Sequence, residues 1–457
     1  MSDKSLENGE EMASDSSSSK RMKEMSIDRL SALPDDVLIH ILSYLGGVRE
    51  SAVTSVLSKR WEFLWTELPR LEFKENSEEP DKIREFVAMV NRSLLIRIGT
   101  HLEKFYVNFR YDKSFASDVD SCLDFVLKNK VKEVCLGLRF VSGDELYGLP
   151  ETMYSNSSLT WFSVSACDMD TLTKIEWRSL TRLEIKDSRL TQHVIENILS
   201  GCPVLHTMDL VECLGFSCLD IKSQNLYELK IHDHDEDKVG PLLEISAPYV
   251  QTLDISFNPE ERKLVLNNIK SLVTAKINFL NYRMNMDDVE STIDELFEIL
   301  KDVKELKLGG DLFEVLSEFV LNGWQLPVSR RKCLTIDTFY ENENNISGLF
   351  ALLKFSPDLE RLAIKGLETD MDIWYEDETW DLDCDLLHLK TVTITEAEDP
   401  PSSVPMLAVA RTLLKRATAL EEMTIRPGVR ELNDHIKISE RLLSYPRSSG
   451  KVVIRLC

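Results

Sequence analysis

The stretch Leu180-Thr181-Arg182-Leu183-Glu184-Ile185 decides the fold of this 457-residue chain, because its pattern returns along most of the sequence. Apolar residues occupy its first, fourth and sixth positions, and mostly polar residues stand between them. Thirteen such six-residue cores follow one another at intervals of 21 to 31 residues, and one of them lacks its first apolar residue. They begin at positions 102, 131, 159, 180, 205, 226, 250, 272, 303, 331, 359, 389 and 420.

A spacing of this size is the period of leucine-rich repeats. The fourth and sixth residues of each core share one face of a short strand, because side chains alternate across a strand. The residue between them, such as Glu184 or Asp209, points to the other face, so stacked copies bury one face and expose the other. Cys167, Cys213 and Asn258 stand at the ninth position, where a side chain in such a repeat satisfies backbone groups of the turn.

The segments between the cores predict helices or loops. Residues 190–199 have apolar side chains at helical spacing, and Gly201-Cys202-Pro203 then ends the helix. Strand and helix units that contact only their neighbours build an elongated, curved solenoid, which presents surfaces for recognition. We therefore expect an α+β fold, in the form of an α/β solenoid.

Composition limits the classes of function. The 65 leucines are about one residue in seven, whereas 17 glycines and 15 prolines are few, which argues against low-complexity architecture. The length predicts roughly two to four domains. With 54 basic and 78 acidic residues, the net charge of -24 makes the chain a poor binder of phosphate backbones, so no nucleic acid partner is expected.

The ends and the cysteines bear on the compartment. Residues 1–26 combine acids, serines and a few bases without an apolar core, which predicts a disordered tail and no secretory signal. Because no run approaches the roughly 18 apolar residues of a membrane span, no membrane partner is expected. The nine cysteines form no C-x-x-C pair, which indicates reduced thiols in the cytoplasm, the nucleus or both.

Residues 27–73 do not follow the repeat. Residues 33–45 read as an amphipathic helix, with apolar side chains at 37, 38, 41, 42 and 45, and Gly46-Gly47 ends it. A second amphipathic stretch leads into Ser58-Lys59-Arg60-Trp61. So short a module cannot easily bury all its apolar side chains internally, which predicts cover by a partner helix or groove.

The same residues resemble an F-box, in the form found in plant F-box, leucine-rich-repeat and FBD proteins. Leu33-Pro34-Asp35, residues 54–65 and Pro69-x-Leu71-x-Phe73 carry the resemblance. It implies a three-helix module that docks on a Skp-family adaptor and through it on a cullin. The chain would then be the substrate-recognition subunit of a Skp-cullin-F-box ubiquitin ligase, binding a target protein for ubiquitination. Gly46-Gly47-Val48-Arg49 departs from the usual linker and implies a looser turn.

The resemblance also implies which residues contact the adaptor. They are Leu33, Pro34, Val37, Leu38, Ile41, Leu42, Val53, Leu57, Trp61, Leu64 and Trp65. An alternative interpretation makes the module a helical cap for the solenoid, in which the tryptophans are core residues.

The C-terminal residues 386–457 resemble the FBD domain of the same family. The resemblance rests on the last two cores and on residues 442–449, and a helix is expected over 407–419. The organisation predicted is thus an F-box at 27–73, a solenoid at 74–367, an acidic loop at 368–385 and an FBD region at 386–457. The loop holds nine acids and no base, and it is either a docking loop for a basic partner or a solvated loop.

No motif for catalysis, cofactor binding or a metal site stands out, so the chain is not expected to be an enzyme. Residues 232–237 hold two histidines among acids, but without further paired ligands they make a weak metal site, and an ordinary polar turn is the preferred interpretation. Beside the ligase hypothesis, a small-ligand receptor or co-receptor and a scaffold outside the ubiquitin pathway remain open. Exposed repeat positions suit a protein or a small molecule equally: Arg182, Lys186, His206, Tyr227, Lys230 and His232.

Overall fold

The computed structural model describes residues 30, 32–99, 101–140, 145–169, 173–233, 242–280, 286–337, 343–367, 382–396, 405–428 and 432–457. The tail predicted at 1–26 and most of the acidic loop predicted at 368–385 lie outside these ranges.

One long parallel sheet dominates the described chain, and its strand order follows the chain order. Its fifteen strands are β1 (Arg70–Lys74), β2 (Lys104–Arg110), β3 (Glu133–Arg139), β5 (Trp161–Ser165), β7 (Arg182–Lys186), β8 (Thr207–Val211), β10 (Glu228–His232), β12 (Thr252–Phe257), β14 (Thr274–Phe279), β15 (Glu305–Leu308), β16 (Cys333–Asp337), β17 (Arg361–Leu367), β18 (Thr391–Glu396), β19 (Glu422–Arg426) and β20 (Val453–Leu456). Thirteen of them, β2 to β19, carry the thirteen predicted cores, so the solenoid prediction is confirmed.

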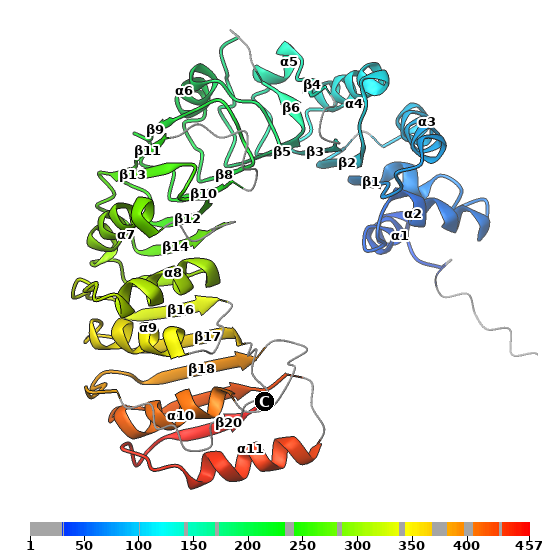
Figure 1. Ribbon diagram of the computed structural model, residues 1–457. Coiled ribbons are helices and arrows are strands. Elements are labelled where there is room, and N and C mark those ends of the chain that lie inside the picture. The colour runs from blue at the N-terminus through cyan, green and yellow to red at the C-terminus, as the bar shows by residue number, and fades with distance from the viewer. Residues whose placement is uncertain are drawn as a thin grey trace, which may run out of the picture.

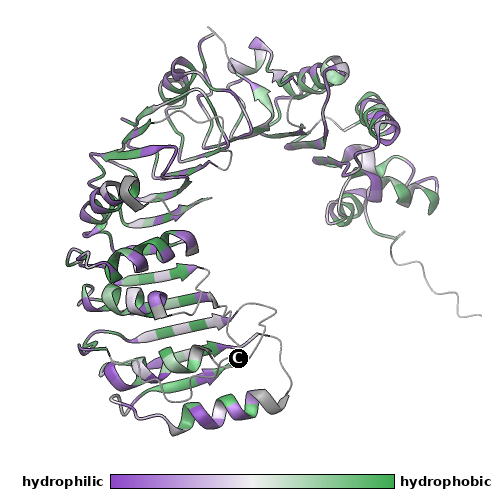
Figure 2. Cartoon of the chain, in the orientation of Figure 1, coloured by the Kyte–Doolittle hydropathy of each residue, from purple (hydrophilic) through white to green (hydrophobic). Residues whose placement is uncertain are grey.

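Equivalent positions of the cores pair across the sheet. Leu183 pairs with Met208 and Ile185 pairs with Leu210, and none of the four side chains is exposed to solvent. Figure 2 shows the resulting alternation of hydrophobic and hydrophilic bands along the strands. The apolar face of the sheet is therefore the core, and the other face is left for contacts outside the chain.

Helices and two short sheets cover the outer side of the long sheet, and the chain forms an open arc with the long sheet on its inner side (Figure 1). The helices are α3 (Pro80–Ile96), α4 (Ala116–Lys128), α5 (Glu151–Tyr154), α6 (Gln192–Gly201), α7 (Met286–Leu300), α8 (Gly310–Leu321), α9 (Glu343–Lys354), α10 (Pro405–Arg416) and α11 (Leu432–Ser444), with a 3-10 turn η3 (Lys113–Phe115). The short sheets are β4 (Tyr147–Gly148) with β6 (Cys167–Asp168), and β9 (Cys218–Asp220), β11 (Leu242–Ser246) and β13 (Lys263–Asn267). No helix within the described ranges is both long and apolar enough to cross a membrane.

Of the three ninth-position side chains, Asn258 bonds within a turn as the repeat pattern predicts, whereas the two cysteines bond to strand carbonyls. The Cys213 thiol donates to the carbonyl oxygen of Ile185 at 3.2 Å, and the Asn258 side-chain oxygen accepts the amide of Glu260 at 3.0 Å. The Cys167 thiol donates to a strand carbonyl at 3.4 Å. Burial raises the pKa of both thiols, so they stay protonated and able to donate.

The N-terminal module is less helical than the three helices expected. It contains α1 (Asp35–Leu42), α2 (Val48–Val53) and two 3-10 turns, η1 (Thr54–Val56) and η2 (Leu64–Glu67). Hydroxyl groups bond to backbone carbonyls at the end of α2, for example Thr54 to Ser51 at 2.6 Å, which competes with continued helix. Its last residues form β1, which pairs in register with β2 and makes the module the first layer of the sheet.

The copy that starts at position 331 has an arginine where the other copies have an apolar residue. Arg331 is only 1% exposed, and its Nε donates to Ser329 at 2.7 Å. Burial lowers its pKa to about 10, and its Nη1 finds no partner in the described part of the chain. This repeat therefore holds a charge inside the core.

Candidate functional site

The N-terminal module exposes a cluster of apolar side chains, here called the docking face. Val56 is 83% exposed, Tyr44 77% and Val53 64%. The complete set is Leu30, Val37, Ile41, Tyr44, Leu45, Val53, Val56, Leu57 and Phe63. So many exposed apolar side chains on a module of this size are typical of an interaction surface.

The structure divides the eleven residues assigned to adaptor contact into two groups. Exposed residues are Pro34, Val37, Ile41, Val53 and Leu57, and Leu33 is half-buried. The buried residues are Leu38, Leu42, Trp61, Leu64 and Trp65, with exposed fractions of 0 to 8%. The exposed group is available to a partner, whereas the buried group packs inside the module and supports its shape.

Helix spacing explains the division. Leu38 and Leu42 lie one turn apart on the side of α1 that faces the rest of the module, and Val37 and Ile41 lie one turn apart on an exposed side; Tyr44 follows in the turn after the helix. The resemblance assigned one role to both sides of the helix. Tyr44, Val56 and Phe63 were not among the predicted residues, although the spacing of Tyr44 from Val37 and Ile41 could have identified it.

Hydrogen bonds fix the module to the first repeat. The Arg97 guanidinium donates to the carbonyl oxygen of Thr66 at 3.1 Å, and the backbone amide of Glu103 donates to the carbonyl oxygen of Pro69 at 2.8 Å. Lys104 on β2 forms an ion pair with Glu72 on β1 at 2.9 Å. Because β1 belongs to the long sheet, the docking face is held in a fixed position relative to the inner face of that sheet.

The second surface is the face of the long sheet that is turned away from the helices, on the inner side of the arc. It is formed by the strand side chains that point away from the core, and it is here called the concave face. It holds fourteen basic residues: Arg70, Lys74, Lys104, Arg110, Arg139, Arg182, Lys186, Lys230, Lys276, Lys307, Arg361, Lys365, Arg426 and Arg455. It holds nine acidic residues: Glu72, Glu133, Glu184, Asp209, Glu228, Asp254, Glu305, Asp337 and Glu422. The surplus of bases is opposite in sign to the net charge of -24 of the whole chain.

Aromatic rings and cations gather on the first strands of the concave face. Lys104 and Arg182 lie over the Trp161 ring, 5.4 and 5.8 Å from its centroid. Lys74 lies 4.9 Å from the centroid of the Tyr106 ring. The indole nitrogen of Trp161 has no acceptor among the described residues. Tryptophan, tyrosine and arginine are the side chains that dominate binding energy at protein interfaces.

The middle of the concave face holds charges that already pair with one another. Lys186 pairs with Glu184 at 2.7 Å and Lys230 with Glu228 at 3.0 Å. Burial, and then the charge of Glu184, raises the pKa of Asp209.

The repeat positions predicted to meet a target lie in two places. Arg182, Lys186, Lys230 and His232 face outward on β7 and β10, as the alternation predicts. His206 and Tyr227 stand just before β8 and β10, with their rings 5.5 Å apart. All six therefore border one continuous surface.

The histidine and acid cluster does not assemble a metal site in the described part of the chain. His232 bonds to Ser256 at 3.1 Å and lies 3.8 Å from Asp254, while Asp233 forms a buried ion pair with Arg262 at 2.5 Å. Residues 234–237 lie outside the described residues. No group of three or more His, Cys, Asp or Glu side chains within those residues could hold a metal ion.

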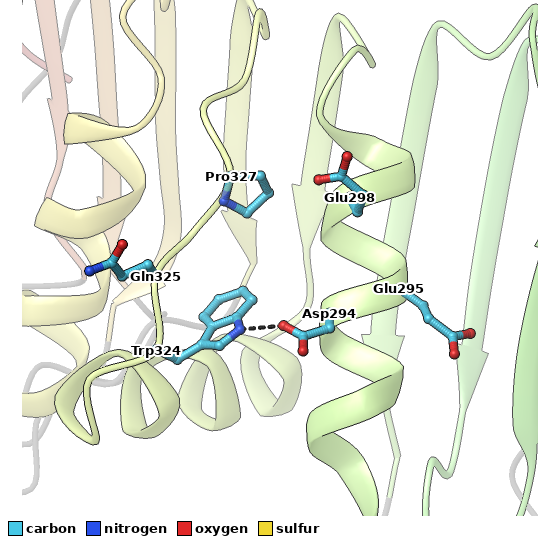
Figure 3. A pocket seen from close by; sticks show the side chains of 6 residues that line it. All are labelled: Asp294, Glu295, Glu298, Trp324, Gln325 and Pro327. Carbon is cyan, nitrogen blue, oxygen red and sulfur yellow. Dashed lines mark hydrogen bonds between the residues drawn. The ribbon is translucent and has the colours of Figure 1, made fainter.

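A shallow hollow of about 410 Å³ lies between α7 and the segment that follows α8 (Figure 3). Its carboxylates already have partners. Asp294 accepts from the Trp324 indole, Glu295 pairs with Lys263 at 3.4 Å, and Glu298 pairs with a lysine at the end of α7. Since its carboxylates are already paired, this hollow gives no support to a small-ligand site.

All nine cysteines lie in described parts of the chain, and none is in a disulfide. Burial raises the pKa of the Cys122 and Cys202 thiols to about 12, so these thiols are unreactive at neutral pH.

Comparisons with known proteins match both parts of the chain. The family described as "At1g61320/AtMIF1, LRR domain" matches residues 96–441, and the F-box domain family matches residues 30–73. The chain is 28% identical to the putative F-box/LRR-repeat protein At3g18150 of Arabidopsis thaliana, over 94% of this chain and 95% of that protein. It is also 28% identical to the F-box/LRR-repeat protein At5g02910 of the same organism, over 74% of this chain and 72% of that protein.

Proposed function

Because the chain belongs to the family of F-box proteins with leucine-rich repeats, we propose that it is the substrate-recognition subunit of a Skp-cullin-F-box ubiquitin ligase. The docking face binds a Skp-family adaptor and through it a cullin, and the concave face binds a target protein. The observation that carries the proposal is the docking face itself, where nine apolar side chains remain exposed on the module that matches the F-box family.

The chain contributes proximity, and the chemistry of ubiquitin transfer belongs to partner subunits. Holding a target beside the ubiquitin donor raises the effective concentration of its lysines. A sheet that runs without a break from β1 to β20 suits this role, because it keeps the target at a constant distance from the adaptor. We assign this work to the cytoplasm or the nucleus, in keeping with nine unpaired cysteines.

The C-terminal residues 386–457 continue the solenoid in this proposal and also close it. The family match reaches residue 441, and β18, β19 and β20 extend the same sheet. Helix α11 packs beside α10 at the end of the arc (Figure 1). A terminal repeat needs a cap because its core would otherwise be open to solvent. Its identity as an FBD domain stays a prediction.

The proposal is tested by mixing the purified full chain with a recombinant Skp adaptor and following the mixture by gel filtration with light scattering. We expect a complex of one adaptor and one chain that survives dilution to micromolar concentration. Elution of the two proteins as separate species would refute adaptor docking.

A further inference from the structure

We propose that the first five strands of the concave face form a docking site for an acidic segment of the target protein, an inference that rests on the proposed function. The site comprises Arg70 and Lys74 on β1, Lys104 and Tyr106 on β2, Trp161 on β5 and Arg182 on β7. These strands lie at the end of the concave face that joins the N-terminal module (Figure 1).

Strand register brings four of these six residues into one row, while Lys74 and Tyr106 stand in neighbouring rows. Arg70 pairs with Lys104, which pairs with Glu133 on β3, and the row continues through Trp161 to Arg182. Neighbouring strands lie about 4.8 Å apart, so this row of five positions is about 19 Å long. An extended peptide of roughly six residues covers that length at about 3.3 Å per residue. The row therefore matches the reach of a short linear segment.

The charge of these strands is the opposite of the charge of the chain. Their outward side chains include seven bases and three acids, whereas the whole chain has a net charge of -24. Within the described residues, Arg70, Lys74 and Arg182 form no ion pair with a carboxylate, and all three are exposed. These cations are available to carboxylates from another molecule, which favours an acidic partner.

The aromatic residues add an anchor to the charge. Trp161 is half-buried between two cations, and its indole N–H is buried without an acceptor in the described chain. An apolar side chain of a bound peptide can pack on the exposed part of the ring. Indole, phenol and guanidinium groups on one surface are the composition of an interface hot spot. The short side chains of Cys135 and Ser163 continue the row of Tyr106 on the next two strands.

The remaining charge of the chain favours a peptide over a nucleic acid. Apart from this face, the surface is strongly acidic, and it repels a long polyanion whose charge extends beyond the site. A short acidic segment within a folded target places its charge only where the bases are. The location also suits the proposed function, because a target held here lies close to the docking face.

The test uses the full chain in complex with its adaptor and a fluorescein-labelled twelve-residue peptide of Glu, Asp and Ser. Fluorescence anisotropy measures its Kd, and a peptide with Gln and Asn in place of the acids is the neutral control. The variant R70Q/K74Q/R182Q removes three unpaired cations from the site. The matched control, K307Q/K365Q/R426Q, removes three cations from the far end of the same face.

We expect the site variant to weaken acidic-peptide binding at least tenfold and the control variant to change it less than twofold. Salt at 0.5 M should abolish most of the binding, because exposed charges are screened. Failure of the wild-type complex to bind the peptide, equal binding of the neutral peptide, equal loss in both variants, or tighter binding of a single-stranded oligonucleotide would each overturn the inference. Gel filtration with the adaptor is read separately, so a failure of adaptor docking is distinguished from a failure of this site.

Discussion

The docking face gives a sharp prediction about two neighbouring residues. Val53 is 64% exposed and Leu57 is 62% exposed, and both lie at the end of α2 and the turn that follows. We predict that the double variant V53D/L57D binds the Skp adaptor roughly 30- to 1,000-fold more weakly than the wild type and folds as the wild type does.

The magnitude follows from the area still open to solvent. Complete burial of a valine or leucine side chain contributes about 1.5–3 kcal/mol, and roughly 60% of each of these two remains to be buried by a partner. The pair therefore contributes about 2–4 kcal/mol to binding, and about 1.4 kcal/mol corresponds to a tenfold change in Kd. Burying a carboxylate without a partner adds to this loss.

The assay is a titration of labelled adaptor with each variant, together with thermal unfolding of the free chain. The matched control is V328D/L387D, since Val328 is 64% exposed and Leu387 60% exposed, and both lie far from the module. A contrasting variant is L38A, because Leu38 has no exposure and its truncation should cost about 2–5 kcal/mol of folding stability. Unchanged adaptor affinity in V53D/L57D, or an equal loss in the control, would refute the assignment of the docking face.

Three further predictions concern the solenoid. A Cβ on Gly348 in α9 would lie 2.1 Å from the hydroxyl oxygen of Ser317 in α8 and 2.9 Å from the Cα of Ser317. The variant G348V should therefore lower the melting temperature by several degrees in differential scanning calorimetry. An unchanged melting temperature would contradict this packing. Burial and Glu184 raise the pKa of Asp209, so the folded state favours the protonated carboxyl group and is destabilised when that group ionises. The free energy of unfolding therefore falls as the pH rises above the ordinary carboxyl pKa. The variant D209N should therefore resist urea better than the wild type at pH 7 and lose that advantage at pH 3.5, and the reverse order would contradict the prediction. Replacement of Arg331 by methionine removes a buried cation that lacks a full set of hydrogen-bond partners. The variant R331M should therefore match or exceed the thermal stability of the wild type. A clear decrease in stability would show that the arginine stabilises the core.

The repeat period in the sequence was sufficient to predict most of the sheet. The positions expected to be buried, such as Leu183 and Ile185, are fully buried, because a period of two assigns alternate side chains to one face whatever the partner strand is. Two strands of the long sheet, β1 and β20, were missed, as were the strands of the two short sheets. Leu68, Leu71 and Phe73 follow the same spacing as the other cores, but they had been assigned to the N-terminal module, and their strand β1 is recognised only by its pairing with β2.

The candidate surfaces were only partly predictable. Alternation predicts that Arg182 and Lys186 face outward, and they do. It does not predict that Lys104 and Arg182, which are separated by 78 positions in the sequence, lie over one tryptophan ring. That contact depends on the register of four strands, and register is a property of the assembled sheet.

The sequence alone determined that repeated strands share a buried face and that a separate apolar module precedes them, because the spacing of apolar residues is a local property of the chain. Only the tertiary structure decided which apolar residues of that module are core and which are surface. Leu38 and Ile41 are equally apolar and lie in one helix, but Leu38 is unexposed and Ile41 is 37% exposed. The difference arises because the rest of the module packs against one side of α1, and no local pattern specifies which side that is.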